Sequence, residues 1–290
     1  MFDLRYCNSY AALFNPSFLG RVADGNHINT LSPLLRESSF EFDRIGTGKL
    51  ADLFDAVYET LTSNYRCEYV YKNILANFLF NERHLSVQEA SLLTELSAAG
   101  SIADAVVANG TTTAYEIKTD LDSFARLPVQ LESYHQVFEN VYVVVSESLV
   151  SRIKKIIRGD TGVIVLTRDN LLVTEREAVS NLDGLNVLSM FDTLRQKEYR
   201  LIIETEFGDT KDVRPAAIHL HCRTRAEQLN PVLFHSYFVE ALKSRTSRND
   251  TVECVIESPT ALRALILSSE VSKVKLRRFI AALSCSFVEA

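Results

Sequence analysis

A strand–turn–strand pattern in the middle of the chain constrains the fold more than any other feature. Residues Ile102–Ala108 and Ala114–Thr119 are short runs dominated by apolar and β-branched side chains. The segment Asn109–Thr113, with a glycine at its second position, separates them. Two such runs joined by a short segment that contains glycine predict a β-hairpin. We therefore expect a sheet built around this hairpin.

Three charged residues of the hairpin are the candidates for chemistry. Residues two apart in a strand point to the same face, so Glu116 and Lys118 project together. The register of the hairpin brings Asp104, on the neighbouring strand, beside them. Two carboxylates can hold Mg²⁺, which prefers oxygen ligands, and the backbone carbonyl of Ile117 offers a third oxygen. Lys118 is a compact positive charge that can position a water molecule or stabilise a phosphoryl transition state.

The spacing of apolar residues predicts the elements around the hairpin. Helices are expected at 49–62, 65–80, 86–98, 123–138 and 149–157. Ser86 and Glu89 form a capping box that would begin the third of these helices, and Gly100 would end it. Strands are expected at 141–145, 162–167 and 171–175. This order predicts an α/β fold, a mixed β-sheet flanked by helices.

The same pattern divides the chain into three parts. Residues 1–63 form an N-terminal extension that is irregular where glycine and proline interrupt it and helical near its end. Residues 64–180 form the α/β core. Residues 186–290 form a mainly helical C-terminal region, with helices expected at 188–206, 231–244 and 259–284.

Two motifs resemble those of a known family. Asp104, followed on the next strand by Glu116-Ile117-Lys118, resembles the signature of the PD-(D/E)XK nuclease superfamily, with Ala103 in place of the proline of that signature. Gln130 and Tyr134 lie one helical turn apart and are similar to the QxxxY motif of the RecB-like branch. The chain also resembles an uncharacterised bacterial family within this superfamily.

The resemblance implies a restriction-endonuclease-like fold and a metal-dependent nuclease, a hydrolase of phosphodiester bonds. It implies Asp104, Glu116 and Lys118 as catalytic residues, with Mg²⁺, or Mn²⁺ in its place, as the cofactor. Gln130 and Tyr134 would contact the nucleic acid, with DNA favoured over RNA. A role in bacterial defence or DNA repair, with a partner protein or as a homo-oligomer, follows by analogy alone.

Several of these residues also have a structural interpretation. Asp104, Glu116 and Lys118 could form a cross-strand salt bridge on a solvated hairpin, but the apolar pattern around them favours the functional interpretation. Glu68 resembles the acidic residue that many members of the superfamily add to the metal site from their first core helix. An ion pair between Glu68 and Lys72, four residues later, is equally expected.

Other polar segments give weaker signals. Asp120 and Asp122 are expected to cap the following helix. His219 and His221, next to Cys222, would share one face of a strand and suggest zinc, but no second ligand pair with zinc spacing follows. The basic residues near the C-terminus are expected to form a solvated helix face, although they could also follow a phosphate backbone.

Composition sets the remaining limits. The net charge of −6 weakens the case for a nucleic-acid partner, because phosphate binding needs local positive potential. The charge is uneven, however: from Lys211 to Ala290 twelve Lys/Arg stand against eight Asp/Glu, so this part has +4 and the remainder −10. Five scattered cysteines without a CxxC pair, and no signal-peptide or membrane-spanning pattern, predict a cytoplasmic protein without a membrane partner.

Two other function classes remain open. The chain could be a catalytically inactive protein of the same fold that binds nucleic acid or a partner protein, although such a protein has no need of the intact Asp-Glu-Lys set. A small-molecule enzyme is the third class, but the sequence has no glycine-rich phosphate loop and no nucleophile elbow.

Overall fold

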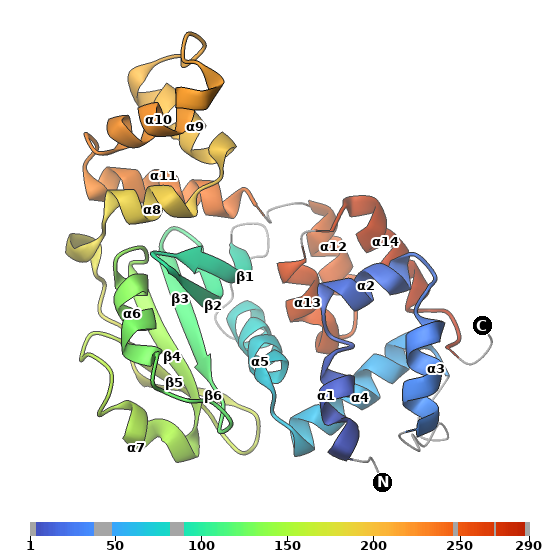
Figure 1. Ribbon diagram of the computed structural model, residues 1–290. Coiled ribbons are helices and arrows are strands. Elements are labelled where there is room, and N and C mark those ends of the chain that lie inside the picture. Colours follow the sequence, from blue (N-terminus) through green and yellow to red (C-terminus); the bar gives the residue numbers. More distant parts are fainter. Residues whose placement is uncertain (1–3, 38–47, 82–89, 246–248, 270, 288–290) are drawn as a thin grey trace. The chain divides into compact units, whose positions relative to one another are not determined.

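The computed structural model describes residues 4–37, 48–81, 90–245, 249–269 and 271–287 (Figure 1). The chain forms two compact units. The first combines Met1–Gln88 with Arg248–Ala290, and the second is Glu89–Ser247. The sheet and the three hairpin residues Asp104, Glu116 and Lys118 all lie in the second unit.

Six strands in sequence order make a mixed sheet in the second unit (Figure 1). They are β1 (Ser91–Ala98), β2 (Ser101–Ala108), β3 (Thr112–Lys118), β4 (Asn140–Ser146), β5 (Gly162–Leu166) and β6 (Leu172–Arg176). β3, β4 and β5 run parallel, and the other neighbours are antiparallel. The predicted hairpin is confirmed as β2 and β3, and the predicted strands near 141, 162 and 171 are confirmed as β4, β5 and β6.

The parallel strands β4 and β5 are mainly apolar, as expected where helices cover both faces of a sheet. All five residues of β5 are buried. Gly162 begins that strand opposite Tyr142 of β4. A Cβ atom on Gly162 would lie 2.3 Å from the Tyr142 ring, so only glycine fits at this position.

The predicted helix at 86–98 is wrong in its described part, because Ser91–Ala98 is strand β1. A two-residue turn, Ala99-Gly100, joins β1 to β2, and both turn residues have positive φ, at 47° and 84°. Such a turn matches the twist of a hairpin. Pairing with β2 at seven of the eight residues of β1 outweighs the local helical pattern of this segment. The predicted capping box, Ser86 and Glu89, lies outside the described residues.

Helix α6 (Leu127–His135) connects β3 to β4 and packs against the sheet through Leu127, Leu131 and Tyr134. It is shorter than the predicted helix at 123–138. Pro128 lies in its first turn, where a proline is tolerated because that N–H needs no intrahelical partner. Helix α7 (Val150–Ile153) is likewise shorter than the predicted helix at 149–157.

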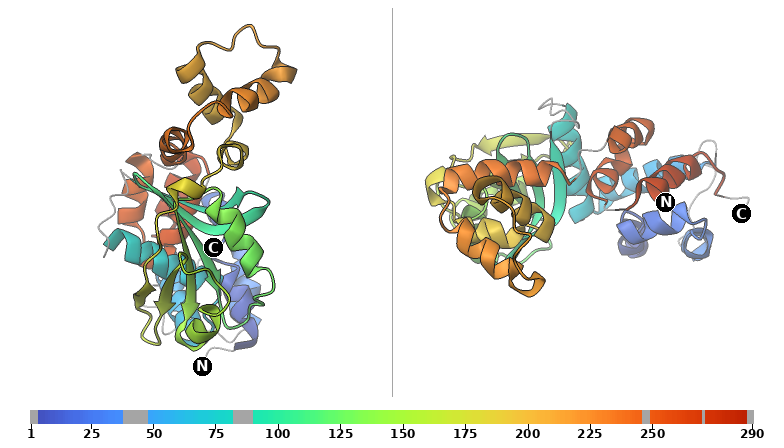
Figure 2. Two further views of the ribbon diagram at one scale, coloured as in Figure 1. Left: turned by 90° about the vertical axis from the view of Figure 1, so that its left-hand side faces the viewer. Right: turned by 90° about the horizontal axis from the view of Figure 1, so that it is seen from above.

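Four helices complete the second unit: α8 (Val187–Thr193), α9 (Gln196–Phe207), α10 (Ile218–Ala226) and α11 (Pro231–Lys243). α8 packs on β1 and α11 on β2, whereas α9 and α10 form the outermost part of the unit (Figure 2). The single helix predicted at 188–206 is divided, because Glu198 accepts a hydrogen bond from the backbone N–H of Arg195 and starts α9 there.

Within the described residues of the first unit the regular elements are helices, joined by turns and one isolated β-bridge between Lys49 and Ser286. Its N-terminal part contains α1 (Cys7–Ala11), α2 (Pro16–Ala23), α3 (Ile28–Glu37), α4 (Leu50–Asn64) and α5 (Glu68–Asn81). The irregular structure expected near Pro16 is therefore wrong. Pro16 occupies the first turn of α2, and the side chain of Asn15 caps that helix by accepting from the N–H of Phe18.

The C-terminal helices α12 (Asn249–Glu257), α13 (Arg263–Ser268) and α14 (Lys273–Ala282) belong to the first unit. The segment predicted as one helix at 259–284 is thus divided in two after a 3-10 turn. The side chain of Asn73 in α5 bonds the backbone at Thr260 and Ala264, and Phe54 of α4 packs edge-on against Phe279 of α14. Residues distant in sequence thereby form one helical core.

The predicted fold class is confirmed: a mixed sheet with helices around it, followed by a mainly helical C-terminal region. The division at 1–63, 64–180 and 186–290 stays a prediction, and the contacts group helix α5 with α13 rather than with the sheet. Among the described helices none combines the length and the apolar character that crossing a membrane requires.

Candidate active site

The hairpin brings the two predicted carboxylates directly opposite each other. Ala105 of β2 pairs with Tyr115 of β3 in an antiparallel register, so Asp104 lies across from Glu116 at the next position. The pairing of β2 with β3 ends at Ala105, which leaves the two carboxylates where the ladder opens. Glu116 is only 1% exposed, and Asp104 is half-buried.

At this opening the side chain of Asp104 takes the place of a backbone carbonyl of β2 as hydrogen-bond acceptor. Its Oδ2 accepts a hydrogen bond of 2.7 Å from the backbone N–H of Ile117. The N–H and C=O of one residue in a strand point in the same direction. The carbonyl of Ile117 is therefore directed toward β2 as well, on the side where Asp104 lies. The two carboxylates thus lie opposite each other at the end of the ladder, and the Ile117 carbonyl is directed to the same side as Asp104.

Glu116 has a partner on each carboxylate oxygen. Lys118 Nζ donates to Oε1 at 2.5 Å, as their shared strand face predicts. The hydroxyl of Tyr134 lies 2.6 Å from Oε2 and 2.5 Å from the carbonyl oxygen of Ile102. This tyrosine has no exposed surface, so its hydroxyl meets Glu116 and the backbone of β2 rather than solvent.

The surroundings of Tyr134 keep its hydroxyl protonated. Burial raises the pKa of Tyr134 well above its ordinary value, and the negative charges of Glu116 and Asp104 raise it further. A hydrogen bond with the side chain of Gln130, one turn earlier on α6, acts in the opposite direction. Gln130 is half-buried beside the site. That Gln130 and Tyr134 contact nucleic acid stays a prediction.

The carboxylate oxygens of Asp104 and Glu116 and the carbonyl oxygen of Ile117 are ligands of the type that a hard cation prefers. Mg²⁺ is usually held by one or two carboxylates and keeps several of its waters. Asp104, Glu116 and the Ile117 carbonyl supply such a set. Among the described residues no group of three or more His, Cys, Asp or Glu side chains gathers as a metal cluster. A metal here would depend on two carboxylates, the carbonyl and water.

Glu68 lies in the other unit, at the first position of α5. Its Oε1 is 2.5 Å from Lys72 Nζ, so the ion pair expected from their spacing is confirmed. The carboxylate side chain is 54% exposed. A role of Glu68 as a metal ligand stays a prediction.

The two aspartates after β3 do not cap the next helix, contrary to expectation. Asp122 accepts from the N–H and the hydroxyl of Thr119, and so closes the turn that follows the strand. Asp120 accepts from the hydroxyls of Ser146 and Ser148 at the end of β4. Side chains of the turn itself therefore satisfy the end of β3, and α6 begins only at Leu127.

Ser146 and Ser148 are polar residues near the site that the sequence patterns did not single out. They follow the continuous apolar run of β4, and the carboxyl ends of parallel strands are where polar site residues gather in open α/β sheets. Their position at the carboxyl end of a buried strand was the signal that could have identified them from the sequence. Together with Asp120 they make a polar edge next to Lys118 in the chain.

The strand predicted for His219 and His221 is wrong, because both residues lie on helix α10. Residues two apart on a helix point about 200° apart, so the two imidazoles do not share a face. Cys222 is fully buried. His219, His221 and Cys222 therefore do not form the zinc site that their spacing suggested.

Comparisons with known proteins place the chain in a phage family. A family model described as "Bacteriophage P4 protein cII" matches residues 62–257, more than half of the chain. Protein cII of Enterobacteria phage P4 is 34% identical over 101 residues, which cover 34% of the chain and 38% of that protein. No solved structure matches the chain. Neither of these two names states an activity. The chain belongs to the bacteriophage P4 protein cII family.

Proposed function

We propose that this protein is a metal-dependent nuclease that hydrolyses phosphodiester bonds, with DNA favoured over RNA. The observation that supports it is the pair of carboxylates, Asp104 and Glu116, that lie opposite each other at the open end of the β2–β3 ladder, with Lys118 hydrogen-bonded to Glu116. The resemblance to the PD-(D/E)XK superfamily is part of the same proposal.

In this proposal Asp104 and Glu116 would hold Mg²⁺ or Mn²⁺. Such a cation lowers the pKa of a bound water and neutralises the charge that develops on the phosphate. Lys118 has a positive charge next to the carboxylates and is 12% exposed, so it can reach a phosphate oxygen or an attacking water at the surface of the site. Tyr134 fixes the orientation of Glu116 by donating to Oε2.

A second candidate is a catalytically inactive protein of the same fold that binds nucleic acid or a partner protein. One observation favours it. Glu116 is almost fully buried, and both of its oxygens already meet donors on Lys118 and Tyr134. A buried ion pair of this kind can have a purely structural role. Removal of one partner leaves the other charge buried without compensation, which destabilises the fold.

The test is cleavage of labelled single- and double-stranded DNA and RNA by the purified chain in Mg²⁺, Mn²⁺ or EDTA. We expect cleavage that requires metal and falls by about two orders of magnitude or more in Asp104→Asn and Lys118→Ala. Glu147→Gln is the matched control, because it removes a carboxylate just after β4 that is 48% exposed and lies 3.9 Å from Arg168. This variant should cleave like the wild type.

The outcome separates the two candidates. Thermal unfolding of each variant first establishes that it is folded, because Lys118→Ala leaves the buried Glu116 without its cation. Cleavage that survives in Asp104→Asn, or no cleavage of any substrate by a folded wild type, would reject the nuclease and favour the inactive binding protein. A gel shift with the same labelled substrates, and light scattering for the oligomeric state, would then identify what that protein binds.

A further inference from the structure

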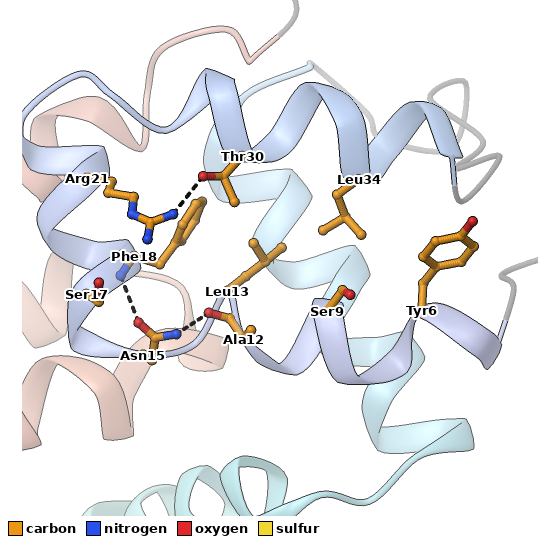
Figure 3. Close-up of a pocket in the computed structure, with 10 residues that line it drawn as sticks. All are labelled: Tyr6, Ser9, Ala12, Leu13, Asn15, Ser17, Phe18, Arg21, Thr30 and Leu34. Atoms are coloured by element: carbon orange, nitrogen blue, oxygen red, sulfur yellow. Dashed lines mark hydrogen bonds between the residues drawn. The ribbon is translucent and has the colours of Figure 1, made fainter.

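A groove in the first unit lies between helices α1, α2 and α3 (Figure 3). Thr30 and Leu34 of α3 face Ser9 and Leu13 across it, with Arg21 of α2 at one end. Its volume is about 380 Å³, which lies in the range of small-molecule sites. We call it the α1–α3 groove.

The floor of the α1–α3 groove is apolar and well supported. Leu13, Phe18 and Leu34 line it and are at most 9% exposed. Phe18 also packs edge-on against Phe54 of α4, with ring centroids 6.1 Å apart. Because Phe18 and Leu13 belong to the core of the unit, the floor is held in place without a ligand. It offers an apolar ring or short chain a preformed surface.

The charge at the rim has one sign. Arg21 is the cation that lines the groove, and no Asp or Glu is among its lining residues. The Nη1 atom of Arg21 donates to the hydroxyl oxygen of Thr30 at 2.8 Å. Asp24, the nearest carboxylate along α2, is instead 2.9 Å from Lys275. The guanidinium thus faces the groove without a carboxylate among the described residues.

We propose that the α1–α3 groove binds a small organic carboxylate with an apolar body. The body would lie on Leu13, Phe18 and Leu34, and the carboxylate would meet Arg21, whose planar fork matches its two oxygens. Thr30 accepts from Arg21, so its own hydroxyl hydrogen is free to donate to the same carboxylate. One guanidinium balances one negative charge, which favours a carboxylate over a phosphate monoester with nearly two.

The probe for this proposal is 2-naphthoate, with the uncharged 2-naphthalenemethanol as its matched control ligand. Both are titrated into the full chain by isothermal calorimetry. We expect saturable binding of 2-naphthoate and binding of the alcohol weaker by roughly fivefold or more, because only the carboxylate pairs with Arg21. Absence of saturable 2-naphthoate binding would overturn the proposal.

Two variants localise the binding. Arg21→Gln should bring the affinity for 2-naphthoate down to that for the alcohol, and Ser9→Trp should fill the groove from its exposed rim and abolish both. Arg126→Gln, an exposed arginine of the second unit, should change neither affinity. Naphthoate affinity that is unchanged in Arg21→Gln or in Ser9→Trp, with both variants folded by circular dichroism, would place the ligand elsewhere and reject the groove.

Discussion

Tyr134 has the most consequential position at the residue scale, because its hydroxyl contacts both strands of the hairpin. It lies 2.5 Å from the carbonyl oxygen of Ile102 on β2 and 2.6 Å from Glu116 on β3. One buried hydroxyl therefore fixes the spacing between the strand with Asp104 and the strand with Glu116. Any chemistry that needs both carboxylates in register depends on this contact.

The variant Tyr134→Phe tests that dependence. It removes the one hydroxyl hydrogen that Glu116 Oε2 and the Ile102 carbonyl share, so we expect the free energy of unfolding to fall by about 1–3 kcal/mol. Tyr142→Phe is the matched control, since that hydroxyl bonds Glu177 at an exposed site. Its effect should stay within about 0.5 kcal/mol. Equal effects of the two variants in urea unfolding would show that Tyr134 does not join the strands.

At the scale of elements, the close pairing of β4 with β5 depends on a glycine. Gly162→Ala places a methyl group 2.3 Å from the Tyr142 ring and 2.8 Å from the backbone nitrogen of Ala178. We expect a loss of about 1–3 kcal/mol in the free energy of unfolding, typical of overpacking. Gly159→Ala meets no atom within 4 Å and should have little effect. Urea denaturation that finds the two variants alike would contradict this packing.

The elements that could be predicted from the sequence are those that a short segment specifies by itself. The hairpin of β2 and β3 is specified by its own turn, and β4 by its continuous apolar run, so both follow from short segments. The strand β1 does not, because its pattern of leucines also suits a helix and only pairing with β2 decides between them. Helix α9 starts inside a longer helical pattern, where the side chain of Glu198 caps it by accepting from the N–H of Arg195.

The candidate site was predictable only in part for the same reason. The pair of Glu116 and Lys118 follows from alternation within one strand, and Asp104 from the hairpin register. The contact between Tyr134 and Glu116 joins a helix to the sheet, and no spacing in the sequence specifies it. Neither does any spacing specify the bond from Ile117 to Asp104, which depends on where the ladder opens.

For the whole molecule, the chain leaves the first unit, builds the sheet unit, and returns. The helices before residue 88 and after residue 248 share one core, as the contact of Phe54 with Phe279 illustrates. A boundary drawn along the sequence cannot represent such a unit. The predicted grouping of α11 with α13 and α14 followed from their shared helical pattern, whereas the contacts assign them to different units.

Two buried histidines and one half-buried histidine make the stability of the molecule depend on pH. Burial lowers the pKa of His27, His135 and His235 from the ordinary value of 6.5. Between the lowered values and 6.5 the unfolded chain binds more protons than the folded chain, so stability rises with pH in that window. We expect the free energy of unfolding to fall as the pH drops below 6.5.

Urea unfolding between pH 7.5 and pH 5 measures this dependence. His235 lies 2.9 Å from the hydroxyl of Thr112, and His135 lies at the same distance from that of Thr161. His135→Gln and His235→Gln remove two of the three titrating groups and should flatten the dependence in part. A wild-type stability that is constant or rises toward pH 5 would contradict the expected sign.

Titration of Mn²⁺ into the purified chain tests the proposed metal centre at Asp104 and Glu116 most directly. Electron paramagnetic resonance reports the fraction of Mn²⁺ that is bound. We predict one saturable site in the wild type, competed by Mg²⁺ and lost in Asp104→Asn, with Glu147→Gln unchanged. No saturable site, or a site of equal affinity in Asp104→Asn, would contradict a metal centre at these two carboxylates.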